Sequence, residues 1–365
     1  MAVLTTKTDT TVEWLIGDGV LRLRLWGTDR IFMLPSAVVD EYLIRSGESC
    51  ALRLDDERVS RKHALLRRVG ETWHLIDLDS KNGVRQDGAQ LREPCVLEPG
   101  VEIGIGGVVL IAESERWIAL RGFCARIIGW TSERMGLVDE MLRSIRLAAR
   151  LRTPLRLGGE SDMVPVAHAL HRHTHGDHRP FVLCDPRRRD VEESVRAVAN
   201  HEVGLEALEA ARGGSLCMRA ERPPHDIAEV LRRVREQDAR VQLIVCSKTR
   251  GARAANDVTS PIVVPPLKGR VNEVPRIVDE YVLDALAALH APRSSLTRSD
   301  RDWIIREAAT TLPEIEKAAL RLIALRTTDT IAAAAVRLGM APVSLTRWID
   351  RRRPPLRGRP GLDTA

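Results

Sequence analysis

Residues 54–63 read LDDERVSRKH, and residues 73–83 read WHLIDLDSKNG. The first stretch leads into the apolar run 64–66, and the second starts with apolar and polar residues in alternation. Such alternation is typical of half-buried strands, and the Asn82-Gly83 pair favours a tight turn. The two stretches therefore predict antiparallel strands at 64–66 and 73–76 whose connections are polar loops.

The same pattern continues on both sides of these stretches. Further strands are expected at 20–25 and 101–105, and Asp-Gly and Gly-Gly pairs supply the turns between them. Short strands separated by turn residues at this spacing favour an antiparallel sandwich. We therefore predict an all-β sandwich over residues 12–122.

Over roughly 35–110, the two quoted stretches resemble the forkhead-associated (FHA) domain. The resemblance implies a β-sandwich that binds phosphothreonine peptides through loops at one end. A dianionic phosphate needs charge-assisted donors from arginine, hydroxyl groups and backbone amides. The resemblance implies that His63 braces the loop around Ser60 and that Asn82 bonds the ligand backbone. The expected phosphopeptide-binding residues are Arg45, Ser60, Arg61, Ser80, Lys81 and Asn82.

One departure concerns the residues before the first motif. The family normally has Gly-Arg there, whereas this chain has Ile44-Arg45 and one extra residue before Cys50. A sandwich that has kept its fold without binding phosphopeptides is therefore the alternative. At the N-terminus, Asp9 follows Thr6 by three residues, a pattern that some such domains prefer. A phosphorylated Thr6 could then bind in the same chain or in a second copy, and an unmodified terminus is the alternative.

From about residue 133, helical stretches alternate with short apolar runs. This alternation predicts a parallel α/β domain over 133–290, followed by a helical lid-like region over 291–325. Buried strands are expected at 181–184, 215–218 and 241–246. Helices are expected at 134–151, 163–172, 191–211, 223–237 and 273–289.

The stretches 157–163, 179–182, 211–218 and 264–270, in that order, resemble the AAA+ module of bacterial sigma-54 enhancer-binding proteins. The family's phosphate loop reads G-E-S-G-T-G-K, and its lysine holds nucleotide phosphate. Here Gly159-Glu160-Ser161 is followed by Asp162, and the lysine is absent. Arg219-Ala220 replaces the acid pair that would hold magnesium. We therefore expect no enzyme activity, no nucleotide hydrolysis and no cofactor. An unrelated α/β domain or an active ATPase are the alternatives.

Residues 326–356 resemble a Fis-type helix-turn-helix. Gly339 supplies the turn, and Pro342 suits the first turn of a second helix. The resemblance implies that this helix enters the DNA major groove while Leu345, Trp348 and Ile349 pack inward. The expected DNA-binding residues are Ser344, Thr346 and Arg347 near the bases and Arg351, Arg352 and Arg353 at phosphates. A helical hairpin for dimerisation with a solvated basic tail is the alternative.

Composition bounds the remaining possibilities. The net charge is +6, and six arginines against one acid lie between Pro342 and Pro360, which favours an anionic partner. The six cysteines form no C-x-x-C pair, residues 1–11 do not resemble a signal peptide, and no apolar run spans a bilayer. These features predict a cytoplasmic protein without a membrane partner. The histidines between His168 and His178 lack the companions of a metal site, so no metal is expected.

Together these patterns predict a multidomain protein with an all-β sandwich, an α/β core and an all-α helix-turn-helix. The predicted function is a phosphothreonine-responsive transcription regulator. Its expected partners are a phosphothreonine-containing protein (a Ser/Thr kinase or its substrate), DNA and a second copy of the chain. The alternative is a phosphopeptide-binding scaffold of a kinase pathway without sequence-specific DNA binding.

Overall fold

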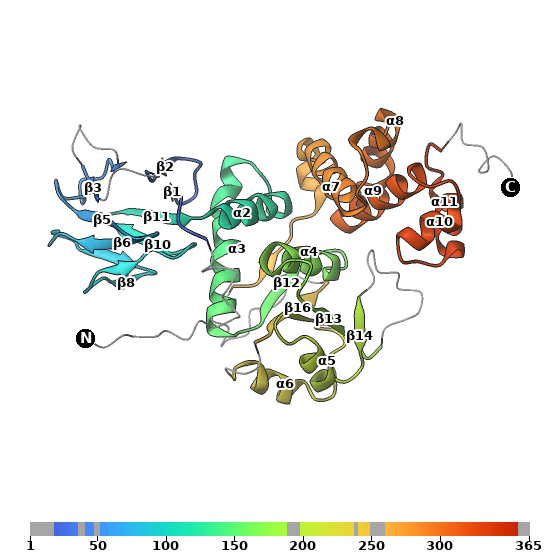
Figure 1. Ribbon diagram of the computed structural model, residues 1–365, viewed down its shortest axis with the longest axis horizontal. Helices are drawn as coiled ribbons and strands as arrows, with labels where there is room; N and C mark the ends of the chain where they lie inside the picture. The colour runs from blue at the N-terminus through green and yellow to red at the C-terminus, as the bar shows by residue number, and fades with distance from the viewer. Residues whose placement is uncertain are drawn as a thin grey trace. The chain divides into compact units, whose positions relative to one another are not determined.

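The computed structural model describes residues 18–35, 41–46, 52–187, 198–236, 240–248 and 260–356. The chain divides into two compact units (Figure 1). The first contains residues up to Thr153 together with His173–Gly176, and the second contains Pro154–Arg172 and the chain from Asp177 onward. Thr6, Asp9 and the extra residue before Cys50 lie outside the described residues.

Two sheets form the sandwich of the first unit, which confirms the predicted all-β fold. Its first sheet has the order β2-β1-β11-β10-β7-β8 and its second the order β4-β3-β5-β6-β9. Neighbouring strands pair antiparallel, apart from β3 and β4, which are parallel. The first sheet is built from β1 (Arg22–Leu25), β2 (Ile31–Met33), β7 (Val84–Gln86), β8 (Ala89–Gln90), β10 (Glu102–Ile105) and β11 (Val108–Glu113). The second is built from β3 (Glu41–Arg45), β4 (Leu52–Arg53), β5 (Ala64–Val69), β6 (Thr72–Asp77) and β9 (Cys95–Val96).

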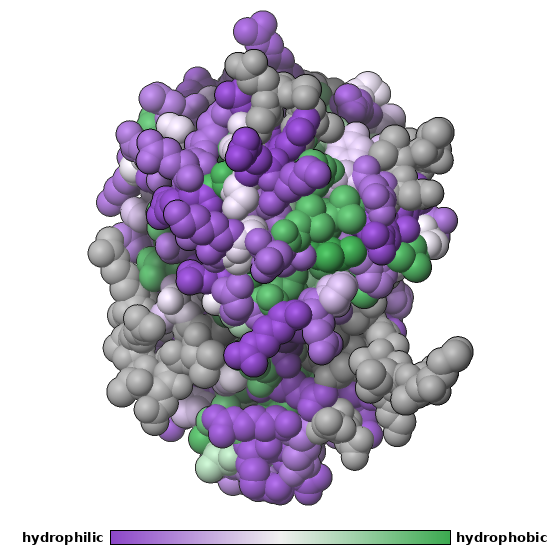
Figure 2. Space-filling view, turned by 90° about the vertical axis from the view of Figure 1, so that its left-hand side faces the viewer, coloured by the Kyte–Doolittle hydropathy of each residue, from purple (hydrophilic) through white to green (hydrophobic). Residues whose placement is uncertain are grey.

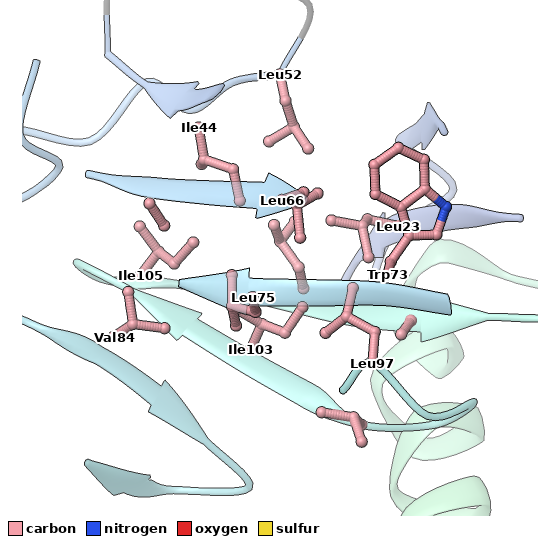
Figure 3. Packing of buried hydrophobic residues seen from close by; sticks show 14 of the residues in the cluster. Leu23, Ile44, Leu52, Leu66, Trp73, Leu75, Val84, Leu97, Ile103 and Ile105 are labelled. Carbon is pink, nitrogen blue, oxygen red and sulfur yellow. The ribbon is translucent and has the colours of Figure 1, made fainter. Parts of the chain in front are cut away.

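Alternate residues of these strands fill the space between the sheets (Figure 3). Leu66 and Leu75 lie directly opposite each other on β5 and β6, and both are fully buried. Leu23 and Ile103 from the other sheet are buried with them. The period-two pattern seen in the sequence therefore reflects one buried face on each sheet.

Helices α2 (Glu115–Ile128) and α3 (Ser132–Leu151) belong to the first unit. The expected boundaries are corrected here, since 115–122 is helical rather than part of the sandwich and 132–151 does not belong with the α/β domain. A buried ionic network explains this placement. The Arg24 guanidinium on β1 bonds Glu113 (Nε–Oε1 2.6 Å) and Asp139 of α3 (Nη2–Oδ1 2.5 Å). All three side chains are fully buried.

The sheet of the second unit is parallel, as expected, with the order β14-β13-β15-β16-β12-β17. Its strands are β12 (Leu155–Gly158), β13 (Phe181–Cys184), β14 (Ala199–His201), β15 (Ser215–Arg219), β16 (Gln242–Ser247) and β17 (Ile262–Val263). The connecting helices are α4 (Val164–His175), α5 (Gly204–Ala210) and α6 (Ile227–Val234). The helix predicted over 191–211 is confirmed over 204–210, but it is wrong over 199–201, which pair with β13 as a strand.

The C-terminal part of the second unit is helical, as predicted. It contains α7 (Val274–Ala288), α8 (Arg298–Trp303), α9 (Leu312–Arg326), α10 (Ile331–Arg337) and α11 (Pro342–Arg352). Short 3-10 turns cover Leu267–Glu273 and Arg293–Ser295, and a π-helical turn covers Ile304–Ala308. The side chains of Thr297, Thr311 and Thr330 accept backbone hydrogen bonds at the starts of α8, α9 and α10. The described helices are all too short or too polar to cross a membrane.

Candidate functional site

The strand register brings three loops to one end of the sandwich. Ile44 of β3 pairs with Ala64 of β5, which pairs with Asp77 of β6. The chain after Ile44, the loop 54–63 and the loop 78–83 therefore lie at the same end. The β10–β11 turn joins them, because a Cβ added to Gly106 would lie 3.0 Å from Oδ1 of Asp56. The predicted phosphopeptide-binding residues all lie on these segments.

The buried side chain of His63 connects the loop 54–63 with the loop 78–83. Its ring is fully buried, Nδ1 accepts a hydrogen bond from the Ser60 backbone N–H (2.9 Å), and Nε2 lies 3.2 Å from the Gly83 carbonyl oxygen. These partners require the neutral tautomer with hydrogen on Nε2, which donates to Gly83. The bracing role expected for His63 is confirmed.

Two further bonds join the loops nearer the surface. The Lys81 backbone N–H donates to Ser60 Oγ (3.2 Å), and Asn82 Nδ2 donates to the Arg58 carbonyl oxygen (2.8 Å). Because Ser60 Oγ accepts from Lys81, its own hydrogen can be donated to a ligand. Asn82, which the sequence assigned to the ligand backbone, also ties the two loops together. The sequence motif alone does not indicate this second role.

The loop 78–83 holds Ser80 in a constrained position. Asp77 Oδ1 accepts from the Ser80 backbone N–H (3.1 Å), and Asp79 and Gly83 adopt φ angles of 55° and 67°. The positive φ of Gly83 lies in the left-handed region, where a side chain is strained, so this position favours glycine. The buried Ser80 Oγ has no hydrogen-bond partner within the described part of the chain. A buried hydroxyl without a partner costs about 1–3 kcal/mol, so this group suits an external acceptor.

The basic side chains at this end of the sandwich differ in exposure and in whether a carboxylate of the chain is paired with them. Arg61 and Lys81 are exposed, whereas Arg45 is half-buried at the end of β3. Arg58 is held by Asp56 (Nη2–Oδ2 3.1 Å), and its hydrogen bond lowers the pKa of the Asp56 carboxyl below the ordinary value. Arg58 was not predicted to have a role.

The outer surface around the sandwich is mainly hydrophilic. Figure 2 looks onto the side of the molecule that carries the sandwich and shows polar side chains around a smaller apolar patch. Such a surface is compatible with a charged peptide ligand.

A protein-family comparison matches residues 45–106 to the FHA domain. These residues form an FHA domain. The match lies inside the range expected from the two sequence motifs and includes all three loops. An FHA domain implies binding of phosphothreonine peptides in signalling.

Solved structures of FHA domains cover the same part of the chain. One, from a structural and functional analysis of phosphothreonine-dependent FHA domain interactions, is 29% identical and covers 26% of this chain and 95% of its own (TM-score 0.24). The FhaA FHA domain, solved with the intracellular domain of another protein, is 31% identical over 25% of this chain and 96% of its own (TM-score 0.23). Mycobacterium tuberculosis EmbR, in complex with a low-affinity phosphopeptide, is 25% identical over 26% and 24% (TM-score 0.25). The curated protein sequences give no match.

The second predicted site lies on α11, which follows α10 after a turn at Gly339 (φ 67°). Leu345 and Trp348 are buried, as expected, and Ile349 is half-buried. Thr346, Arg347, Arg351 and Arg353 are exposed, whereas Ser344 is half-buried. The Thr346 hydroxyl donates to the Pro342 carbonyl oxygen (3.2 Å).

Arg352 differs from the exposed arginines because it is half-buried and already has a partner in the chain, and its phosphate contact stays a prediction. Its Nη2 donates to Glu314 Oε2 of α9 (2.8 Å), and both side chains are half-buried. Burial acts to raise the pKa of the Glu314 carboxyl, but the charges of Lys317 and Arg352 and the hydrogen bond from Lys317 outweigh it and lower the pKa. The pair therefore stays charged at neutral pH and fastens the end of α11 to α9.

The two positions at which the AAA+ resemblance breaks down lie at the carboxyl edge of the parallel sheet. Asp162 follows β12, and Arg219 ends β15. The Arg219 guanidinium forms two bonds with the Asp162 carboxylate, Nη1–Oδ1 of 2.5 Å and Nη2–Oδ2 of 2.9 Å. Arg219 Nε and Arg222 Nη1 both donate to Oδ2 of the fully buried Asp185 (3.0 and 3.2 Å). Asp185 was missed, although its place directly after a predicted buried strand could have indicated it.

Two histidines of the second unit, His171 and His168, pack against neighbouring side chains. His171 is buried between Ser215 Oγ (2.8 Å from Nδ1) and the Arg179 carbonyl oxygen (3.1 Å from Nε2). Burial lowers the pKa of His171, so the ring is neutral at pH 7. His168 stacks on Phe181 with ring centroids 4.5 Å apart. Within the described ranges, His, Cys, Asp and Glu side chains form no group of three that could hold a metal ion.

Proposed function

We propose that this protein is a phosphothreonine-responsive, DNA-binding transcription regulator whose α/β core does not hydrolyse nucleotide. The observation that carries the DNA-binding part is the division of α11 into two faces. One face packs inward through Leu345 and Trp348, and the other exposes Thr346, Arg347 and Arg351. A helix that follows a tight turn and exposes arginines in this way suits the major groove.

The FHA loops support the signal-receiving part of the proposal. Ser60, Ser80 and Arg61 supply two hydroxyl donors and an exposed cation at one end of the sandwich. A phosphate group on threonine accepts such donors, and the unphosphorylated side chain does not provide the charge. The partner would be a phosphothreonine-containing protein, either a Ser/Thr kinase or its substrate.

The carboxyl edge of the parallel sheet supports an inactive core. Nucleotide phosphates and magnesium need free donors and free carboxylates at such an edge. Here the Arg219 guanidinium forms two hydrogen bonds with Asp162, and the Asp185 carboxylate is paired with Arg219 and Arg222. We infer that the core relays a signal between the two ends of the chain or serves as a scaffold, and that it is not an enzyme.

Two further parts of the proposal concern setting and assembly. The cysteines in the described segments, Cys95, Cys124, Cys184, Cys217 and Cys246, are free, which suits a reducing cytoplasm. A single helix-turn-helix binds weakly, so a symmetric homodimer on a palindromic site is expected.

A phosphopeptide-binding scaffold without sequence-specific DNA binding is the second candidate. The contact between Arg352 and Glu314 favours it, because that pair engages one of the arginines expected at phosphates and uses α11 for internal packing.

Selection from fragmented genomic DNA across a salt series separates the two candidates. The purified chain is compared with Arg347→Ala, which removes an exposed cation. Enriched sites that survive moderate salt and disappear in the variant support the regulator. Uniform, salt-labile binding that the variant leaves unchanged supports the scaffold.

A further inference from the structure

The carboxyl edge of the parallel sheet contains an anion-binding arrangement that the chain fills by itself. In the strand order β15-β16-β12, the ends of β15 and β12 lie on either side of β16. Arg219 comes from the first of these ends and Asp162 from the loop after the other. Their two parallel hydrogen bonds have the geometry with which arginine also binds phosphate.

The position of Asp162 is one that an external anion could take. In open parallel sheets, ligands bind outside the carboxyl ends of the strands, and the N-terminus of the next helix favours negative charge. Asp162 lies two residues before the first residue of α4, Val164, and its Oδ1 accepts from the Val164 backbone N–H (3.1 Å). The carboxylate therefore receives both a guanidinium and a helix N–H.

Arg219 is held in place independently of Asp162. Its Nε donates to the fully buried Asp185, which Arg222 also contacts. Removing the Asp162 side chain would leave the two Nη groups of Arg219 pointing at the same place, still fixed through Nε. The Arg219 side chain is only 12% exposed, so its charge would be poorly compensated by water.

The loop that carries Asp162 is packed against its surroundings. Met163 packs against Gly159, where an added Cβ would lie 2.9 Å from its Sδ and Cε atoms. The Gly159 backbone N–H donates to the Ser247 carbonyl oxygen (3.3 Å), which ties the loop to the end of β16. The loop is thus packed in the conformation that places Asp162 on Arg219.

We propose that Asp162 is a built-in anion. Its carboxylate occupies, from within the chain, a latent site for a phosphate group that is formed by Arg219 and the start of α4. The second unit therefore reaches a ligand-bound arrangement without a ligand, and external phosphate cannot enter while Asp162 is present. Loss of the Asp162 carboxylate opens the site to inorganic phosphate. This inference is independent of the proposed DNA binding.

The test compares the full chain with Asp162→Ala, with Asp162→Asn and with the double variant Asp162→Ala/Arg219→Ala. Each is titrated with inorganic phosphate up to about 10 mM, well above the Kd of about 1 mM that corresponds to roughly −4 kcal/mol of binding free energy. Because phosphate can also bind the FHA loops, binding is read as hydrogen–deuterium exchange of peptides covering 158–165 and 215–222.

The proposal predicts no phosphate-dependent protection of these peptides in the unchanged chain. It predicts saturable protection, at least tenfold slower exchange, in Asp162→Ala, weaker protection in Asp162→Asn, and none in the double variant. A single variant that folds only when phosphate is present would support the proposal, because the added anion replaces the missing charge. Protection in the unchanged chain equal to that in Asp162→Ala would overturn it. So would the absence of protection in both folded single variants, or the failure of both to fold in phosphate.

Discussion

The loop end of the FHA domain and the carboxyl edge of the parallel sheet both present groups that bind anions, but they differ in what already neutralises them. At the FHA end, Arg61 is exposed and Ser80 Oγ has no partner among the described residues. At the sheet edge, Arg219 bonds two carboxylates of its own chain. The first region is prepared for an external phosphate, whereas the second contains its own acid.

This difference shows that the residue types at a site do not by themselves determine whether it binds. Arginine next to a helix start or a polar loop occurs in both regions. What separates them is whether an internal carboxylate lies within hydrogen-bond distance. Within the FHA end the same rule distinguishes Arg58, which Asp56 neutralises, from the exposed Arg61.

The largest effect is expected at the carboxyl edge of the parallel sheet. Asp185→Ala removes a fully buried carboxylate that accepts hydrogen bonds from both Arg219 and Arg222. Breaking a buried ion pair in this way costs about 3–5 kcal/mol. Urea unfolding of the second unit measures the loss. Asp177→Ala, at an exposed position, serves as the control and should change stability by less than about 0.5 kcal/mol. Equal stabilities of the two variants would contradict the buried network.

At the loop end of the FHA domain the expected effect is on peptide binding rather than on stability. Arg61→Ala should weaken binding of a phosphothreonine peptide roughly 10- to 100-fold, because a hydrogen bond to a charged group contributes about 1.5–3 kcal/mol. Fluorescence anisotropy with a peptide selected from a degenerate phosphothreonine library measures it. Arg67→Ala, an exposed arginine on the strand β5, is the matched control. A loss of stability without a loss of affinity would show that Arg61 has a structural role instead.

The same contrast exists on a smaller scale on α11. Arg347 is exposed, whereas Arg352 is paired with Glu314. Arg347→Ala should lower DNA affinity by about 1–3 kcal/mol if Arg347 contacts a base edge. Arg352→Ala should change unfolding stability by about 1 kcal/mol or less, since its ion pair is only half-buried, and should leave DNA affinity almost unchanged. The opposite ranking in a DNA-binding titration would reverse the assignment of the two arginines.

The smallest effect concerns pH, because a different acidic group titrates in each region: the Asp162 carboxyl at the sheet edge and the phosphate of the ligand at the FHA domain. Burial acts to raise the pKa of the Asp162 carboxyl, but the hydrogen bonds and charge of Arg219 outweigh it and lower the pKa. Its contribution to stability is therefore complete above about pH 4, the ordinary carboxyl range, and is lost as the pH falls through the lowered value. Because the side chain is 41% exposed, we expect this loss to be below about 1 kcal/mol.

Phosphopeptide binding should weaken at higher pH than this, since a phosphate group takes up its second proton near pH 6. Peptide affinity measured between pH 7 and 5 should fall, whereas the ion pair of Asp162 with Arg219 stays intact over this range. The second unit itself should lose some stability below about pH 6.5, because burial lowers the pKa of His171 and the unfolded chain takes up that proton first. His171→Gln should remove this loss of stability without changing the pH dependence of peptide affinity, and an unchanged loss in that variant would mean that a different group titrates in the second unit.

The sequence predicted those features that depend on neighbouring residues. Alternation around Leu66 and Leu75 identified the sandwich, and the polar loops carrying Ser60 and Ser80 predicted segments that the structure brings to one end of it. The pairing of Asp162 with Arg219 could not be predicted, because the two residues are far apart in the chain and meet only through the strand order. For the same reason the place of α3 was missed, since an amphipathic helix does not reveal that Asp139 will bond Arg24.

Hydrogen–deuterium exchange of the full chain tests the contrast between the two regions most directly. One sample receives the degenerate phosphothreonine peptide library, a second the unphosphorylated library and a third ATP with magnesium. We expect slower exchange over 58–63 and 78–83 with the phosphorylated library alone, and unchanged exchange over 158–165 with ATP. Protection of 158–165 by ATP, or equal protection of the FHA loops by both libraries, would contradict it.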